Sequence, residues 1–182
     1  MMQFIPTGID GLLQIQPQVH RDHRGFFLES YSAEQFDKAG ITCRFVQDNH
    51  SCSMETGVLR GLHFQKPPFA QTKLIRVTRG RIFDVAVDLR TKSPTFGRWF
   101  GLELSADNFT MLLIPAGFAH GFCTLENETH VEYKVDTPYA PQYDSGIIWN
   151  DPEIAVSWPV AAPILSAKDA KLPRLHETPS PF

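Results

Sequence analysis

Short segments typical of β-strands follow one another through most of the chain, and this pattern limits the possible folds more than any other feature. Polar and apolar residues alternate in Lys73–Arg79, and a second such run, Arg81–Asp88, begins directly after Gly80. Alternation with a period of two places successive side chains on opposite faces of a sheet. We therefore expect two strands joined by a tight turn at Arg79-Gly80.

Other segments have the same character, rich in apolar residues and bounded by turn residues. The further expected strands are Phe26–Tyr31, Arg44–His50, Val58–Gln65, Arg98–Leu104, Met111–Ile114, Gly121–Leu125, Thr129–Val135 and Gly146–Trp149. Many short strands at this spacing favour a sandwich or closed barrel over βαβ units. We expect a single all-β domain over residues 1–182, a usual length for one domain.

Only two regions depart from the strand pattern. Ser32 to Gln35 forms a capping box, and Gly40 fits the end of a short helix of about two turns. From Trp158 onward repeated prolines exclude regular sheet, and residues 166–170 could form one helical turn. We expect this tail to wrap over the barrel, with its last residues loose.

Charge and cysteine content exclude several classes of function. The formal net charge is −3, so the chain has no basic field for duplex nucleic acid. It lacks an apolar stretch long enough to cross a membrane, and its first residues lack the pattern of a signal peptide. The three cysteines are scattered, which fits unpaired thiols in a reducing cytoplasm better than a disulfide framework or zinc site. We expect a cytoplasmic protein with no nucleic-acid or membrane partner.

Polar groups gather among the apolar strand residues of a few segments. These are Gln47–His50, Val58–Gln65, Ile114–Phe122 and His130–Val135. In the last of them, strand parity puts Tyr133 on the face of Val131 and Val135. Its ring is therefore either a core side chain with a satisfied hydroxyl or a group that faces an internal site.

His63 and Arg60 fall on opposite faces of their expected strand, because they are three residues apart. If both line one pocket, the alternation must break between them, and Gly61 is a natural site for a β-bulge. Taken alone, His63 fits a hydrogen-bonded core or surface histidine as well as a catalyst.

The run from Pro115 to His120 reads Pro-x-Gly-x-x-His, which resembles the second signature of cupin β-barrels. In metal-binding cupins that histidine is a ligand, and the first signature adds a His-x-His pair that aims two imidazoles at one ion. The matching place here reads His63-Phe64-Gln65, with one histidine. We therefore expect a barrel without a metal.

Together these motifs resemble the dTDP-4-dehydrorhamnose 3,5-epimerase family, from about Pro6 to Asp169. The resemblance rests on residues 22–29, 45–51, 57–63, 83–88, 93–97, 114–122 and 149–152, in that order. It implies a cupin jelly-roll barrel, a homodimer and no cofactor. The implied reaction is epimerisation of dTDP-4-keto-6-deoxyglucose at C3 and C5 to dTDP-4-keto-L-rhamnose, on the way to dTDP-rhamnose.

The resemblance also implies roles for the matching residues. His63 would be the base that removes a proton beside the ketone, with Asp169 orienting its ring, since imidazole titrates near neutrality. Lys73 would stabilise the enolate oxygen, and Tyr133 would return the proton on the opposite face. The implied substrate-binding residues are Arg24, Phe27, Glu29, Gln47, Asn49, Arg60, Lys73, His120, Tyr139, Asp144 and Lys168. Asp144 stands where the family usually has glutamate, which leaves the reach of its shorter arm open.

Other functions remain open from the sequence. An epimerase for C3 or C5 alone, or a ketoisomerase on the same barrel, would use the same residues. The absent His-x-His pair argues against a metal-dependent cupin oxygenase. A non-catalytic sugar-binding cupin would have no need of a base and an acid such as His63 and Tyr133.

Overall fold

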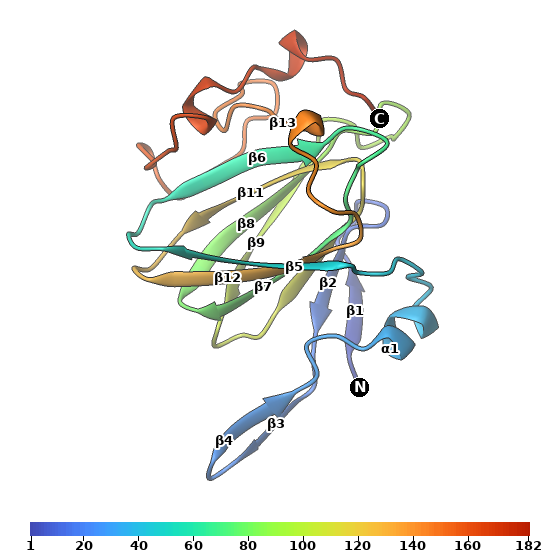
Figure 1. Ribbon diagram of the computed structural model, residues 1–182. Coiled ribbons are helices and arrows are strands. Elements are labelled where there is room, and N and C mark those ends of the chain that lie inside the picture. The colour runs from blue at the N-terminus through green and yellow to red at the C-terminus, as the bar shows by residue number, and fades with distance from the viewer.

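Two antiparallel β-sheets face each other and form the body of the protein (Figure 1). The computed structural model describes residues 1–182. The six-stranded sheet has the order β1 (Gln3–Pro6), β2 (Leu13–Gln16), β10 (Met111–Ile114), β7 (Lys73–Arg79), β12 (Thr129–Val135) and β5 (Gln47–Ser53). The five-stranded sheet has the order β13 (Asp144–Gly146), β6 (Leu59–Gln65), β11 (Phe118–Thr124), β8 (Arg81–Asp88) and β9 (Trp99–Ser105). The expected all-β jelly-roll barrel is confirmed.

The remaining elements lie outside the two sheets. Strands β3 (Val19–Asp22) and β4 (Gly25–Leu28) pair only with each other and form a hairpin. The helical elements are α1 (Ala33–Lys38) and the short 3-10 turns η1 (Pro141–Tyr143), η2 (Asp169–Lys171) and η3 (Leu175–Glu177). The structure contains no helix of the length and apolarity that spanning a membrane would require.

Strand alternation explains where the core lies. Ile82 and Ala86 of β8 point between the sheets with Ile75 of β7, in a cluster of 12 buried residues. The opposite face of β8, with Val85 and Val87, is covered by the C-terminal tail. β8 is therefore buried on both faces, which explains why it reads as an almost continuous apolar run.

The helix predicted near the start is confirmed, and its cap has the expected partner. The Oγ of Ser32 accepts a hydrogen bond from the backbone N–H of Gln35. Phe36 is fully buried and packs edge-on against Phe4 and Tyr31. The helix thereby closes one end of the outer face of the six-stranded sheet.

Several strand boundaries differ from the prediction. β4 and β5 are displaced from the predicted Phe26–Tyr31 and Arg44–His50, and β13 ends at Gly146 where the predicted strand began. Strands β1, β2 and β3, each of four residues, were not predicted.

The turn at Gly80 is present, but it does not join a hairpin as predicted. β7 belongs to the six-stranded sheet and β8 to the five-stranded sheet, so the chain crosses between sheets there. Gly80 has φ +75°, and a Cβ would lie 2.5 Å from Oγ1 of Thr129. The left-handed backbone and this close contact both require glycine.

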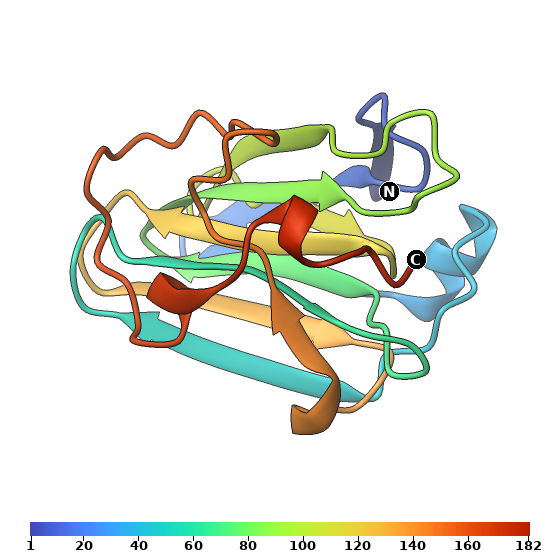
Figure 2. The same cartoon turned by 90° about the horizontal axis from the view of Figure 1, so that it is seen from above.

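The C-terminal tail wraps over the five-stranded sheet, as expected (Figure 2). Its last residues are not loose, which corrects the prediction. The backbone N–H of Thr91 donates to the carbonyl of Phe182 at 3.0 Å, and the Phe182 ring packs on Phe64. The apolar ring of the last residue therefore anchors the tail end.

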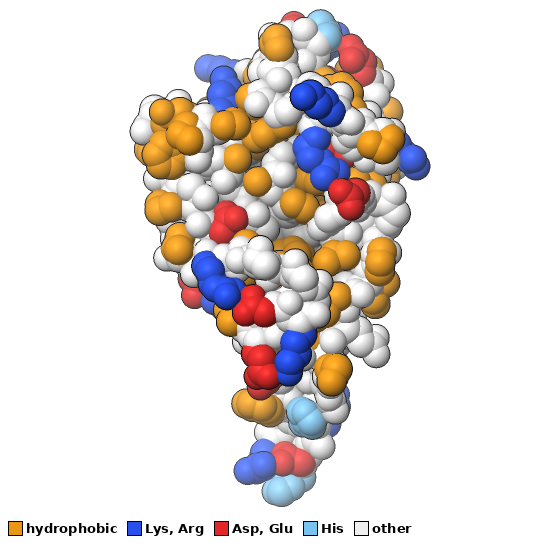
Figure 3. Space-filling view, turned by 90° about the vertical axis from the view of Figure 1, so that its right-hand side faces the viewer, with side chains coloured by type: hydrophobic (Ala, Val, Ile, Leu, Met, Phe, Trp, Pro, Cys, Tyr) orange, Lys and Arg blue, Asp and Glu red, His pale blue; other side chains and the backbone are white.

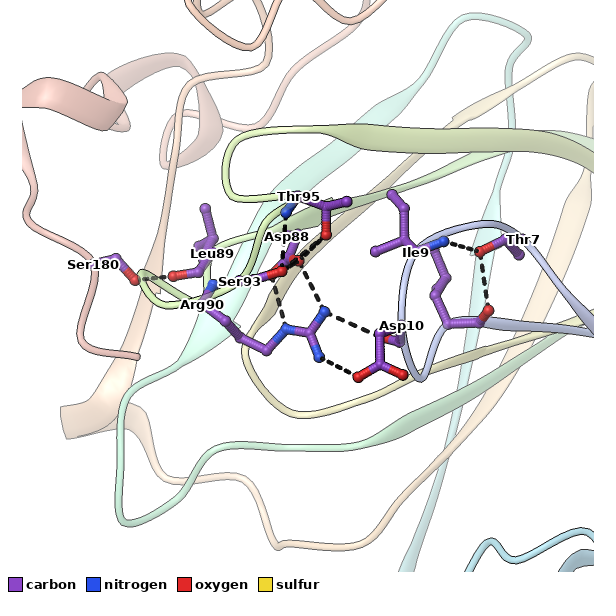
Figure 4. A network of polar contacts seen from close by, with 10 residues as sticks. Thr7, Ile9, Asp10, Asp88, Leu89, Arg90, Ser93, Thr95 and Ser180 are labelled. Atoms are coloured by element: carbon purple, nitrogen blue, oxygen red, sulfur yellow. Dashed lines mark hydrogen bonds and ion pairs between the residues drawn. The ribbon is translucent and has the colours of Figure 1, made fainter.

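A polar network at the end of β8 ties distant segments together (Figure 4). The buried carboxylate of Asp88 accepts hydrogen bonds from Arg90, Ser93 and Thr95. Arg90 also donates to the backbone carbonyl of Asp10 at 3.0 Å. These charge-assisted hydrogen bonds hold the pKa of Asp88 well below its usual range, although burial alone would raise it. The network fixes the loop after β8 against the N-terminal loop.

Candidate active site

A cavity of 470 Å³ opens between the two sheets, under part of the C-terminal tail. Both sheets and the tail contribute to its wall. The lining residues are Ser51, Val58, Leu59, Arg60, His63, Lys73, His120, Phe122, Tyr133, Ile164, Leu165, Ser166, Lys168 and Asp169. All four predicted catalytic residues are among them, together with three predicted binding residues besides Lys73: Arg60, His120 and Lys168.

A β-bulge brings Arg60 and His63 to the same cavity. His63 is opposite His120 in the register of β6 and β11, whereas Arg60 is opposite Phe122. Three steps along β6 therefore match two along β11, and the extra residue lies at the predicted place, near Gly61. Because of it, two side chains three residues apart share one face.

Gly61 cannot be replaced without moving the strands. Its φ is +133°, and a Cβ there would lie 2.5 Å from the Cα of Gly121 on β11. Both the backbone conformation and the contact exclude a side chain. Glycines on both strands thus allow the bulge that places His63.

His63 and Asp169 form a hydrogen-bonded dyad. Nε2 of His63 and Oδ1 of Asp169 are 2.6 Å apart, with the histidine side chain 30% exposed and the aspartate 4%. Burial alone would raise the pKa of Asp169, but the hydrogen bond and charge of His63 outweigh it and lower that pKa. A carboxylate in this position fixes the tautomer of the imidazole and stabilises its protonated form. The ring can therefore act as a base toward the cavity.

Lys73 and Tyr133 enter the cavity from the opposite sheet. Tyr133 lies on the same face of β12 as the buried Val131 and Val135, as strand parity predicted. Burial raises its pKa, so the phenol keeps its proton at neutral pH. Burial lowers the pKa of Lys73 to about 8, against the opposing charges of Asp144 and Asp84. The six-stranded sheet thus supplies a proton donor and a cation.

His120 is held by a buried carboxylate. Its Nε2 lies 2.7 Å from Oδ1 of Asp84, within hydrogen-bond distance, and burial lowers the pKa of His120. The ring is therefore neutral at neutral pH. The structure brings no group of three histidine, cysteine, aspartate or glutamate side chains into a metal-binding arrangement.

Four further predicted binding residues adjoin the cavity at its rim, since Asn49 is opposite the cavity residue Tyr133 in the strand register and Asp144 pairs with Lys168. Nε2 of Gln47 donates to Oδ1 of Asn49 at 2.8 Å, and the backbone N–H of Tyr139 donates to Oε1 of Gln47 at 3.2 Å. Asp144 accepts a hydrogen bond from the Tyr139 hydroxyl at 3.1 Å and forms an ion pair with Lys168. The shorter arm of aspartate at position 144 therefore still reaches both neighbours.

The structure does not bring Arg24, Phe27 and Glu29 to the cavity of their own chain. They lie on or directly after the β3–β4 hairpin, which projects from the barrel as a narrow extension (Figures 1 and 3). Arg24 pairs with Asp22, and Phe27 is 68% exposed. Glu29 accepts a hydrogen bond from Gln35 at 2.6 Å. None of these three side chains lines the cavity of its own chain.

Sequence reasoning missed the role of Asp84. It was included only within the motif of residues 83–88, whereas the structure places it against His120. A charged residue within an otherwise apolar buried strand was the available signal, since such groups are rarely buried without a partner.

Comparison with known proteins agrees with this geometry. The family model described as dTDP-4-dehydrorhamnose 3,5-epimerase matches residues 6–177. The dTDP-4-dehydrorhamnose 3,5-epimerase of Shigella flexneri is 51% identical over 92% of this chain and 93% of its own.

Solved structures resemble the whole barrel. The dTDP-4-dehydrorhamnose 3,5-epimerase of Bacillus anthracis, crystallised with TDP and PPi bound, has a TM-score of 0.95 and 55% identity over 96% of this chain and 100% of its own. The corresponding Legionella pneumophila enzyme, in complex with dTDP-4-keto-L-rhamnose, has a TM-score of 0.93 and 46% identity over 97% and 94% of the two chains.

Proposed function

Because the chain belongs to the dTDP-4-dehydrorhamnose 3,5-epimerase family, we propose how its own residues perform that reaction. The protein is an isomerase that converts dTDP-4-keto-6-deoxyglucose to dTDP-4-keto-L-rhamnose. One observation carries the assignment of roles. A histidine–aspartate dyad on one sheet and a lysine with a tyrosine on the other line the same cavity.

His63 is the base. C3 and C5 both adjoin the C4 ketone, so their protons are acidic only if the developing enolate is stabilised. Neutral His63 takes the proton, the C–H electron pair forms the enolate double bond, and negative charge moves to the C4 oxygen. Asp169 stabilises the imidazolium, as its hydrogen bond to the ring supports.

Lys73 and Tyr133 complete the reaction. The ammonium group of Lys73 stabilises the enolate oxygen inside a cavity where solvent screens charge weakly. Tyr133 then donates its hydroxyl proton to the carbon from the other side, and the enolate electrons form the new C–H bond. Solvent reprotonates the tyrosinate and removes the proton from His63. Since side chains perform both transfers, the proposed reaction uses no cofactor.

Substrate binding is assigned to the cavity rim. Arg60, Lys168 and His120 line the cavity, and the two cationic residues suit the diphosphate, which guanidinium can grip through two hydrogen bonds. Gln47, Asn49, Tyr139 and Asp144 supply polar contacts for the sugar and nucleotide.

A homodimer explains the residues that the single chain leaves unused. The hairpin carries Arg24 and Phe27 away from their own cavity, with Phe27 68% and Phe26 58% exposed. We assign the hairpin to the site of a second copy, where Phe27 stacks on thymine, Arg24 contacts phosphate and Glu29 accepts from the base. Exposed aromatic side chains on a projecting element are typical of such contacts.

We place the reaction in the cytoplasm. All three cysteines are free thiols, which supports a reducing compartment.

The test is incubation with dTDP-4-keto-6-deoxyglucose in D₂O, followed by NMR. The proposal predicts inversion with deuterium at both C3 and C5. Deuterium at one carbon alone would replace it with the narrower epimerase. Binding without any exchange would overturn the epimerase assignment.

A further inference from the structure

A second histidine–aspartate pair lies beside the first in the same sheet. His120 on β11 is directly opposite His63 on β6 in the strand register. Oδ1 of Asp84, on the neighbouring strand β8, lies 2.7 Å from Nε2 of His120. The cavity wall thus carries two adjacent imidazoles, one held by the tail and the other by β8.

The side chain of Asp84 is fully buried, yet one of its two carboxylate oxygens lacks a hydrogen-bond partner. Its side chain has no exposed surface, and its Oδ2 atom has no hydrogen-bond partner. A buried carboxylate with an unpaired oxygen costs free energy unless nearby positive charge compensates it. A purely structural role leaves that cost unexplained.

The positive charge that compensates the buried carboxylate of Asp84 is the ammonium group of Lys73. Asp84 from β8 and Asp144 from β13 act on this lysine. Asp84, Lys73 and His63 from β6 act on His120. Asp144 is already engaged by Lys168 and Tyr139. Asp84 is therefore the carboxylate that still has an unused oxygen to favour the ammonium form of Lys73.

We propose that Asp84 is a positioning residue for the epimerisation, one that fixes the neutral tautomer of His120 and keeps Lys73 cationic. This inference rests on the proposed function. With Nε2–H committed to Asp84, the Nδ1 atom of His120 has no proton and can accept a hydrogen bond from a sugar hydroxyl. With the carboxylate nearby, the lysine retains its charge for the enolate oxygen.

Loss of the carboxylate has a predictable consequence for each partner. An amide at position 84 can donate as well as accept, so either nitrogen of His120 could carry the proton. The pKa of Lys73, which Asp84 raises, would fall further. The lysine would then lose its proton, and the enzyme its activity, at a lower pH.

The test compares Asp84→Asn with Asp88→Asn. Both aspartates are fully buried on the same face of β8, but Asp88 serves the Arg90 network outside the cavity. For Asp84→Asn we expect kcat to fall about 100-fold, dTDP to bind as before, and the basic limb of the pH–rate profile to move to lower pH. Asp88→Asn should lose thermal stability and keep the wild-type profile. A basic limb that stays in place in Asp84→Asn would overturn the proposal.

A second measurement uses the unaltered protein, in case Asp84→Asn does not fold. ¹⁵N NMR of histidine-labelled protein reports which ring nitrogen carries the proton. We expect His120 to be protonated at Nε2 alone near neutral pH, and protonation at Nδ1 would overturn the proposal. Because this readout needs no turnover, it separates failure of the inference from failure of the proposed epimerase chemistry.

Discussion

His63 and Tyr133 reach one cavity from opposite sheets, His63 on β6 and Tyr133 on β12. We therefore expect a sugar ring bound between the sheets to have one of these side chains near each face. Inversion at a carbon requires removal of the proton from one face and delivery to the other. Two groups on the same strand could not supply that separation, whereas two sheets of a barrel do.

Tyr133→Phe separates proton exchange from inversion. We expect epimerisation to fall by about 100-fold or more, because the proton donor is lost. His63 can still remove a proton and return a solvent deuteron on the same face, so deuterium should enter unepimerised substrate. NMR of the sugar in D₂O measures both processes. Inversion at near the wild-type rate would show that Tyr133 is not the donor.

We expect Lys73 to set the upper pH limit of the reaction. In the proposed mechanism only its protonated form stabilises the enolate, and burial lowers its pKa to about 8. We expect kcat/KM, which reports the ionisation of the free enzyme, to decline as the pH rises through about 8. Lys73→Met should be inactive at every pH. A profile that stays flat up to the ordinary range of lysine, about pH 10, would contradict this role.

We expect the buried ammonium group of Lys73 to lower the free energy of unfolding. Its folded pKa lies below the unfolded value, so the unfolded chain binds more protons between these two values, and stability rises with pH across that interval. At pH values below the folded pKa of Lys73, the full free-energy cost of burying its charge applies. We expect Lys73→Met to stabilise the protein by up to about 3 kcal/mol at neutral pH, measured by denaturant unfolding. Destabilisation at neutral pH would contradict the burial argument.

Gly61→Ala should disrupt the bulge that brings Arg60 and His63 together. Its Cβ would lie 2.5 Å from the Cα of Gly121, which requires the strands to separate. We expect a loss of about 3 kcal/mol or more by thermal unfolding, with loss of activity. Gly97→Ala is the matched control, since Gly97 has φ +75° and nothing near its Cβ. It should cost only about 1 kcal/mol; equal losses would refute the steric account.

Mixing two inactive variants tests whether the hairpin serves a partner. One variant carries Arg24→Ala and Phe27→Ala, and the other carries His63→Ala. If the hairpin acts in trans, a mixed dimer contains one intact cavity facing one intact hairpin, and activity returns after co-refolding. Sedimentation should show dimers throughout. A mixture that forms mixed dimers but remains inactive would place the hairpin's function elsewhere.

The sequence correctly predicted structural features that depend on residues close together in the chain. The cap at Ser32, the inward face of Tyr133 and the irregularity at Gly61 all follow from short-range geometry. It could not show that the chain crosses between sheets at Gly80, because pairing partners are set by contacts distant in sequence. The dyad partner Asp169 came from family resemblance, since no local pattern links residues 106 positions apart.

Residues that lie away from the cavity of their own chain were the least accessible to sequence reasoning. Arg24, Phe27 and Glu29 were expected around the same site as His63, yet the hairpin carries them away from it. Asp84 was hidden for a different reason. Alternation in β8 gives two faces, and both are buried, so polarity alone could not tell which face meets the cavity.

Deuterium exchange by His63→Ala tests the central claim most directly. The variant is incubated with dTDP-4-keto-6-deoxyglucose in D₂O, with dTDP binding measured in parallel. His176→Ala, at an exposed tail histidine that pairs with Glu153, is the matched control and should exchange as the wild type does. We predict no deuterium at C3 or C5 for His63→Ala while dTDP still binds. Exchange at near the wild-type rate would show that His63 is not the base.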